Sequence, residues 1–166
     1  RGPRCRIRLE SQLLPRRYRR LRRPGVWVNL RRPWPPVRGW VIQQMLKIAA
    51  TATAEADTVL IADSDVVLVR PTTAARFRSA GRLGLYRVDD AVHEGMARHI
   101  RWHHVAHRLL GLNAPPRLPL ADYVSSLNFW DPAVVWAMQE RITATTGRSW
   151  LDAFAAELHI SEFILY

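Results

Sequence analysis

Two aspartates within an otherwise apolar stretch constrain this chain more than any other feature of its sequence. The stretch runs from Val59 to Val69, and Asp63 and Asp65 are its only charged residues. Residues two positions apart on a strand point to the same side, and two carboxylates about 4 Å apart repel by about 4 kcal/mol at an effective dielectric of about 20. The apolar setting adds a desolvation cost for each charge. The pair therefore predicts a compensating divalent cation at the end of a buried strand.

The chemistry of Mg²⁺ and Mn²⁺ narrows this prediction. Both ions prefer oxygen ligands in octahedral geometry, and Mg²⁺ usually takes one or two carboxylates while phosphates and water complete its shell. A short acidic pair at a strand end thus suits a metal–diphosphate site. The other interpretation is a solvated turn in which aspartate is an ordinary turn former. The apolar flanks on both sides favour the metal site.

Strand-like and helix-like segments alternate along the rest of the chain. Strands are predicted at 26–30, 58–62, 66–69, 83–88 and 123–130, with an extended proline-rich loop at 33–36. Helices are predicted at 38–52, 95–110 and 132–146, and another after Ser149. The helix at 132–146 has the clearest ends, because Asp131 suits the N-cap, Pro132 the first helical position and Gly147 the C-terminal stop. This alternation predicts an α/β domain with a largely parallel or mixed sheet.

Positive charge is concentrated at the start of the chain. Of the net charge of +11, residues 1–38 contribute +12, from 13 arginines and the single acid Glu10, and residues 39–166 contribute −1. We expect residues 1–24 to form a basic, partly disordered arm and residues 25–166 to form the domain. The arm could contact an anionic membrane surface weakly, and no specific nucleic acid partner is expected.

Hydropathy and cysteine content indicate the cellular compartment that we expect for this chain. No apolar run approaches the ~18 residues that span a bilayer, and no signal peptide is visible. Cys5 is the only cysteine, so an intrachain disulfide is excluded and a reducing compartment is expected. We therefore expect a cytoplasmic location, or one peripheral to the inner membrane face. Because the chain begins at Arg1 and ends at Tyr166 without a tail, we expect a truncated domain.

The acidic pair resembles the motifs of two enzyme families. Metal-dependent nucleotide-sugar glycosyltransferases of the GT-A fold carry Asp-x-Asp after a hydrophobic strand, and phosphohydrolases of the haloacid-dehalogenase type carry Asp-x-Asp-x-Thr/Val there. The run Asp63-Ser64-Asp65-Val66-Val67 satisfies both patterns. The phosphohydrolase pattern needs a lysine downstream of its nucleophile, whereas the only lysine, Lys47, lies upstream. This difference favours the glycosyltransferase.

Three further pieces resemble a sparsely characterised bacterial branch of glycosyltransferases: the stretch from Gly39 to Pro71, the run Asn128-Phe129-Trp130, and residues 161–166. The resemblance covers about residues 38–166. It implies a GT-A-like mixed sheet flanked by helices, and transfer of a sugar from a nucleotide diphosphate sugar to a hydroxyl acceptor. It also implies Mn²⁺ or Mg²⁺ as cofactor, and a role in cell-surface polysaccharide or glycoconjugate synthesis.

The same resemblance implies roles for charged side chains. Asp65 would ligate the metal directly, and Asp63 would contact the metal, its water or the ribose. His159 is a candidate for a further metal ligand. Lys47 would face the phosphates or the donor sugar, although an ordinary exposed helix lysine is an equal alternative. Glu162 follows the natural N-cap Ser161 and is the candidate general base of an inverting enzyme, whereas a retaining enzyme would need no such base.

Polar and aromatic residues are the candidates for binding the sugar or the acceptor. Gln43 and Gln44 are adjacent on a predicted helix, so only one of them is expected to face the site. Asn128 and Trp130 end a predicted strand and could line the pocket, although tryptophan is more often part of a core.

Two other functions stay open. A phosphohydrolase would use Asp63 as nucleophile and Asp65 as general acid. A basic anion- or nucleic-acid-binding module would depend on residues 1–38 instead, and its binding would fall steeply with salt.

Overall fold

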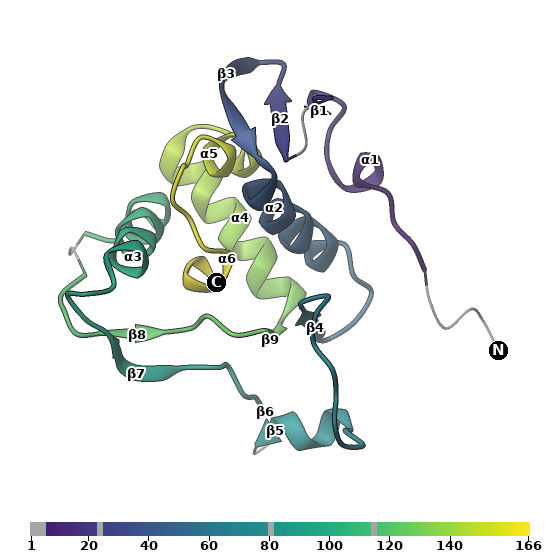
Figure 1. The fold of residues 1–166 in the computed structure, drawn as a ribbon, viewed down its shortest axis with the longest axis vertical. Helices are drawn as coiled ribbons and strands as arrows, with labels where there is room; N and C mark the ends of the chain where they lie inside the picture. The colour runs from purple at the N-terminus through teal and green to yellow at the C-terminus, as the bar shows by residue number, and fades with distance from the viewer. Residues whose placement is uncertain (1–5, 23–24, 80–81, 114–115) are drawn as a thin grey trace.

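The computed structural model describes residues 6–22, 25–79, 82–113 and 116–166. Figure 1 shows helices grouped around the chain's C-terminal end, with short strand pairs at the edges of this group. The helices are α1 (Glu10–Leu13), α2 (Gly39–Ala52), α3 (Ala97–Leu110), α4 (Pro132–Thr146), α5 (Trp150–Ala155) and α6 (Glu162–Leu165), with a 3-10 turn, η1 (Ala74–Phe77). The strands are β1 (Tyr18–Arg20), β2 (Val26–Asn29), β3 (Arg32–Arg38), β4 (Val59–Ala62), β5 (Arg78–Ser79), β6 (Arg82–Leu83), β7 (Val88–Val92), β8 (Leu120–Asp122) and β9 (Leu127–Trp130).

The α/β class is confirmed, but the predicted largely parallel or mixed sheet does not form among the described residues. Every strand pair among the described residues is antiparallel: β1, β2 and β3 form one sheet, and β4–β9, β5–β6 and β7–β8 form two-stranded sheets. Alternation of strands and helices does not specify which strands pair. Here β4 pairs with the distant β9 instead of the next strand, so no parallel crossover unit forms.

Helix α2 follows from its apolar spacing. Val41, Met45 and Ile48 fall on one face of the helix and are buried. Burying a side chain of this size contributes about 1.5–3 kcal/mol. The buried face packs against α4 and α5, which places α2 at the centre of the core.

The ends of α4 form as predicted. Asp131 accepts a hydrogen bond from the backbone N–H of Ala133 at 2.7 Å, and Pro132 occupies the first turn. Gly147 ends the helix in the left-handed region at φ 66°, where residues with a Cβ are strained.

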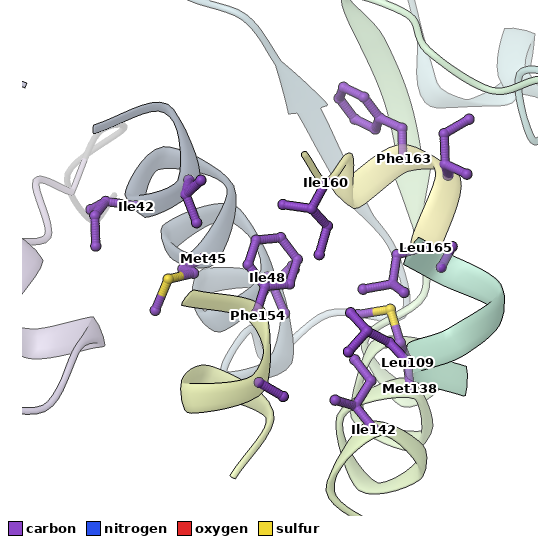
Figure 2. Packing of buried hydrophobic residues seen from close by; sticks show 14 of the residues in the cluster. Ile42, Met45, Ile48, Leu109, Met138, Ile142, Phe154, Ile160, Phe163 and Leu165 are labelled. Atoms are coloured by element: carbon purple, nitrogen blue, oxygen red, sulfur yellow. The ribbon is translucent and has the colours of Figure 1, made fainter. Parts of the chain in front are cut away.

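The core joins all the long helices to the C-terminal residues. Figure 2 shows Phe154 of α5 and Ile160 beside Ile48 of α2, with Leu109 of α3 close to Met138 of α4. The C-terminal residues 160–165 are therefore part of the interior, and α6 packs against both α2 and α3.

The strand predicted at 66–69 does not form. The N–H of Val66 donates to the Asp63 carbonyl at 3.2 Å in a turn, and pairing with β9 ends at Ala62. Without a partner strand, Val67 and Val69 are 80% and 87% exposed. Apolar composition alone therefore overestimated this strand.

Three other predicted boundaries move. Of the strand predicted at 83–88 only the ends are in strands, Leu83 in β6 and Val88 in β7. Of the strand predicted at 123–130 only the part from Leu127 on forms, as β9, because β8 ends at Asp122. Asp122 accepts from the N–H of Val124 at 3.0 Å, which turns the chain between β8 and β9. The proline-rich loop at 33–36 is part of β3, which lies at the edge of its sheet, where missing N–H donors are tolerated.

The described part of the predicted basic arm belongs to the fold. Strand β1 pairs with β2 across the expected boundary at residue 25, and Tyr18 is 4% exposed. The Tyr18 hydroxyl donates to Asp152 of α5 at 3.0 Å, and Arg17 contacts the same carboxylate at 3.3 Å. An arm separate from the domain is therefore wrong for residues 6–22, while Cys5 lies outside the described residues.

No helix within the described ranges is long and apolar enough to cross a bilayer.

Candidate functional site

A mainly polar cavity of about 440 Å³ lies where α2, α3, α6 and the turn after β4 meet. Its lining comes from five parts of the chain: Trp40, Gln43, Gln44 and Lys47 of α2; Asp63, Ser64 and Asp65; Arg98 and Trp102 of α3; Val124; and Ser161, Glu162 and Phe163. Both predicted metal-binding aspartates and the predicted base thus face one space.

Lys47 is at the centre of the site. Its Nζ donates to Asp63 Oδ1 and to Glu162 Oε1, each at 3.0 Å, and lies 4.8 Å from the centroid of the Phe163 ring. The lysine side chain is 18% exposed and that of Glu162 is 5% exposed. The structure therefore builds a half-buried triad of one cation between two carboxylates.

The surroundings of the triad raise the pKa of both Lys47 and Glu162. Burial alone would lower the pKa of Lys47, but the Glu162 and Asp63 carboxylates outweigh it and the pKa is raised. Burial raises the pKa of Glu162, and the Lys47 ammonium opposes that rise. Glu162 is thus a more basic carboxylate than an exposed glutamate, held in place by its cation.

The two aspartates differ in their surroundings. The Asp63 N–H donates to the Ser126 carbonyl at 3.1 Å, which anchors the turn against the start of β9, and its side chain is engaged by Lys47. Asp65 is exposed, and in the part of the chain that the structure describes its carboxylate forms no ion pair. The charge of Asp63 is therefore compensated by Lys47, whereas the sequence predicted a divalent cation. The Asp65 carboxylate remains open to a ligand.

Asp63 and Asp65 could hold a cation only together with oxygens of a ligand or water. Among the described residues, no group of three or more His, Cys, Asp or Glu side chains could enclose a metal ion. Two neighbouring carboxylates are nevertheless the usual protein contribution where phosphates complete the shell of Mg²⁺.

Both glutamines line the cavity, which corrects the expectation that only one could. Gln43 is exposed, whereas Gln44 is buried and its Oε1 accepts from the Glu162 N–H at 3.0 Å. Successive helix positions are about 100° apart, and the cavity covers an arc wide enough for both. The Gln44 Nε2 is buried and has no hydrogen-bond partner among the described residues.

Asn128 and Trp130 do not reach the cavity. Both lie on the face of β9 turned to the core, and each is 1% exposed. Asn128 donates to the Ser125 carbonyl at 3.1 Å, and the Trp130 ring stacks on Tyr166 with centroids 5.3 Å apart. Their predicted binding role is therefore wrong, because the alternation of β9 turns these side chains toward the helices.

His159 is also separated from the aspartates. It lines a neighbouring hollow of about 310 Å³ instead of the cavity that holds Asp63 and Asp65. The structure therefore does not bring it together with the other predicted metal ligands.

Trp40, Arg98 and Trp102 are among the cavity residues that were not predicted from the sequence. Trp40 lies four positions before Gln44 and seven before Lys47, so helical spacing could have placed it on the same face. Arg98 and Trp102 carried no such signal, because only the packing of α3 brings them here.

The opposite face of the β4–β9 pair borders an apolar hollow of about 390 Å³, lined in part by Leu60, Leu127 and Phe129. Among the described residues, the lining of this hollow includes no cluster of carboxylates or imidazoles, whereas the polar cavity brings three carboxylates and Lys47 together.

The fold and the cavity define a mixed α/β protein with a polar site built on a lysine between two carboxylates. The chain belongs to a family of unknown function, DUF6492, whose model matches residues 2–166. No curated protein and no solved structure matches it.

Proposed function

We propose that this chain is the catalytic part of a metal-dependent glycosyltransferase of the GT-A type, which moves a sugar from a nucleotide diphosphate sugar to a hydroxyl acceptor. The observation that carries the proposal is the acidic pair after β4, which faces the same cavity as Lys47, Glu162 and two glutamines. Carboxylates for a metal–diphosphate and amides for sugar hydroxyls are the groups that such a transfer needs.

Asp65, together with Asp63, would hold Mn²⁺ or Mg²⁺ against the diphosphate. When bound, the ion would supply Lewis-acid neutralisation of the charge on the leaving diphosphate. The open carboxylate of Asp65 supports this assignment, since it has no competing cation among the described residues.

Lys47 would orient the site and contribute a fixed positive charge. Its ammonium holds both the Asp63 and the Glu162 carboxylates at 3.0 Å, so it fixes the distance between the proposed metal site and the proposed base. A preorganised cation of this kind stabilises developing negative charge without reorganisation.

The unpaired amide of Gln44 supports a ligand in this cavity. Leaving a buried donor unsatisfied costs about 1–3 kcal/mol, and an oxygen of a bound sugar would remove that cost. Gln43, at the exposed side of the same cavity, offers a second amide.

Glu162 would act as the general base of an inverting transfer. The carboxylate would take the proton of the acceptor hydroxyl as that oxygen attacks the sugar carbon and the bond to the diphosphate breaks. Burial raises the pKa of Glu162, which suits proton abstraction near neutral pH.

The decisive experiment measures binding of nucleoside diphosphates with and without Mn²⁺ by calorimetry. Asp65→Ala should weaken the Mn²⁺-dependent binding at least about tenfold, which is about 1.4 kcal/mol, while circular dichroism shows the fold intact. Asp57→Ala is the matched control, because Asp57 precedes β4 and lies outside the polar cavity. Equal affinity of wild type and Asp65→Ala, with and without Mn²⁺, would refute the proposal.

One contact favours a second candidate, the phosphohydrolase. Lys47 Nζ lies 3.0 Å from Asp63, which would be the nucleophile of that reaction. Asp63 would attack phosphorus, the ester bond would break with Asp65 protonating the alcohol, and water would then release phosphate. A covalent aspartyl phosphate that is lost in Asp63→Asn would select this reaction, whereas metal-dependent release of nucleoside diphosphate from a nucleotide sugar would select the transferase.

A further inference from the structure

A second hollow adjoins the polar cavity and has a different chemistry. It has a volume of about 310 Å³ and is lined by Arg38, Trp40, Arg98, Trp102, Leu158 and His159. Trp40, Arg98 and Trp102 also line the polar cavity, so the two spaces share a wall. The polar cavity holds three carboxylates, whereas the lining of this second hollow contains none. We call it the cationic hollow.

Its two guanidinium groups are not neutralised by the protein. Arg38 ends β3, and its guanidinium donates to the Leu158 carbonyl at 3.4 Å, while Arg98 lies in the first turn of α3. Neither forms an ion pair with any residue that the structure describes, and both side chains are exposed to a ligand from solvent. Because both guanidiniums line one hollow and come from different elements, an anion bound there would be attracted to both.

The aromatic wall adds a second and independent observation. The Trp40 and Trp102 rings lie 5.8 Å apart at an interplanar angle of 31°. Trp102 is 7% exposed, and its Nε1 is buried without a hydrogen-bond partner among the described residues. A buried indole N–H normally donates to an oxygen, so its orphaned donor in the shared wall points to a missing acceptor.

We infer that the cationic hollow binds a phosphate group, and that this group is carried by the acceptor. Guanidinium forks match the oxygens of phosphate in bidentate geometry, and the tryptophan wall offers an apolar surface for the part of the acceptor beyond the phosphate. The shared wall would place such an acceptor next to Glu162. The assignment to the acceptor rests on the proposed function, whereas phosphate binding by Arg38 and Arg98 does not.

Phosphate binding can be tested without metal or nucleotide. In the presence of EDTA and at constant ionic strength, inorganic phosphate is titrated into the full chain while the tryptophan indole N–H signals are followed by NMR. The Trp102 signal, assigned from Trp102→Phe, should shift saturably. Arg98→Ala should weaken binding at least fivefold, and Arg38→Ala should weaken it as well. Arg101→Ala, which removes the same charge from an exposed position on the same helix, should leave it unchanged.

The outcomes separate this inference from the proposed function. Equal effects of Arg98→Ala and Arg101→Ala, or a Trp102 signal that does not saturate, would overturn the phosphate site, because both indicate diffuse attraction to a basic protein. Asp65→Ala should bind phosphate as the wild type does. The phosphate site can therefore be supported while Mn²⁺-dependent nucleotide binding is refuted, or refuted while that binding is supported.

The source of the phosphate is resolved by two further probes. A soluble sugar phosphate and vesicles that contain phosphatidic acid present the same phosphomonoester group on a carbohydrate and on a lipid. Binding of either probe that depends on Arg98 supports the site and identifies the source, and binding of neither overturns the inference that the phosphate is carried by an acceptor.

Discussion

Replacing Lys47 with methionine should destabilise the protein, because it leaves two carboxylates without their shared cation. The larger effect comes from Glu162, whose side chain is 5% exposed, since removing one partner of a buried ion pair costs about 3–5 kcal/mol. The Asp63 side chain is 35% exposed, so water can solvate its carboxylate when the ammonium is removed. Its ion pair with Lys47 therefore contributes at most about 1 kcal/mol to the free energy of unfolding. Because Lys47 itself is partly exposed, we expect a total loss of about 2–4 kcal/mol.

Urea and thermal unfolding, followed by circular dichroism at pH 7, measure this loss. For a chain of this size 1 kcal/mol corresponds to about 2–4 °C, so a loss of about 3 kcal/mol lowers the Tm by about 6–12 °C. Arg108→Met is the matched control, because its pair with Glu157 at 2.7 Å has an exposed cation and should cost less than about 1 kcal/mol. Adding Glu162→Gln to Lys47→Met should restore at least half of the loss, since it removes the unpaired charge.

The pH dependence gives an independent check. The folded-state pKa of Glu162 is raised above its ordinary value of 4.5, and loss of Lys47 would raise it further. A raised carboxyl pKa means that the folded state binds the proton more tightly than the unfolded state does. The contribution of Glu162 to the free energy of unfolding is therefore fully present below pH 4.5, and it is lost as the pH rises through the folded-state pKa. The deficit of Lys47→Met should therefore shrink from pH 8 to pH 4.5. The reasoning would be refuted if Lys47→Met lost less than about 0.5 kcal/mol of unfolding free energy at pH 7, which is about a third of the free energy of a tenfold change in the folding equilibrium. It would also be refuted if adding Glu162→Gln did not reduce the loss.

Two further predictions concern the fold. Asp152→Asn should cost about 1–3 kcal/mol by urea unfolding, because Asp152 accepts hydrogen bonds from Tyr18 at 3.0 Å and Asn29 at 2.9 Å; equal stability of the two proteins at pH 7 would contradict it. Burial alone would raise the pKa of Asp152, but its hydrogen bonds and Arg17 outweigh that and lower it, so its contribution is present above pH 3.8 and should disappear as the pH falls through the folded-state pKa. Trp130→Ala should cost about 3–5 kcal/mol in the same assay, whereas a pocket role without a core role would leave stability unchanged.

The elements that the sequence predicted are those stabilised by neighbouring residues. Asp131 and Pro132 start α4, Gly147 stops it, and Ser149 caps α5 through contacts within three positions. The apolar face of α2 was equally readable, because helical spacing depends on sequence distance alone. Val66–Val69 failed for the opposite reason, since a strand needs a partner and β9 ends its pairing at Ala62.

The candidate site divides in the same way. The sequence by itself predicted the strand that precedes Asp63 and Asp65, although only Ile61 of β4 is buried, and the helical turn that Glu162 opens behind Ser161. Only the tertiary structure decided that Lys47 joins them, because Lys47 and Glu162 are 115 positions apart and meet through the packing of α6 on α2. It also turned Trp130 into the core and set Arg98 beside Arg38. Local hydrogen bonds and spacing act within a few residues, whereas burial and charge pairing depend on which surfaces meet, and that is a property of the whole chain.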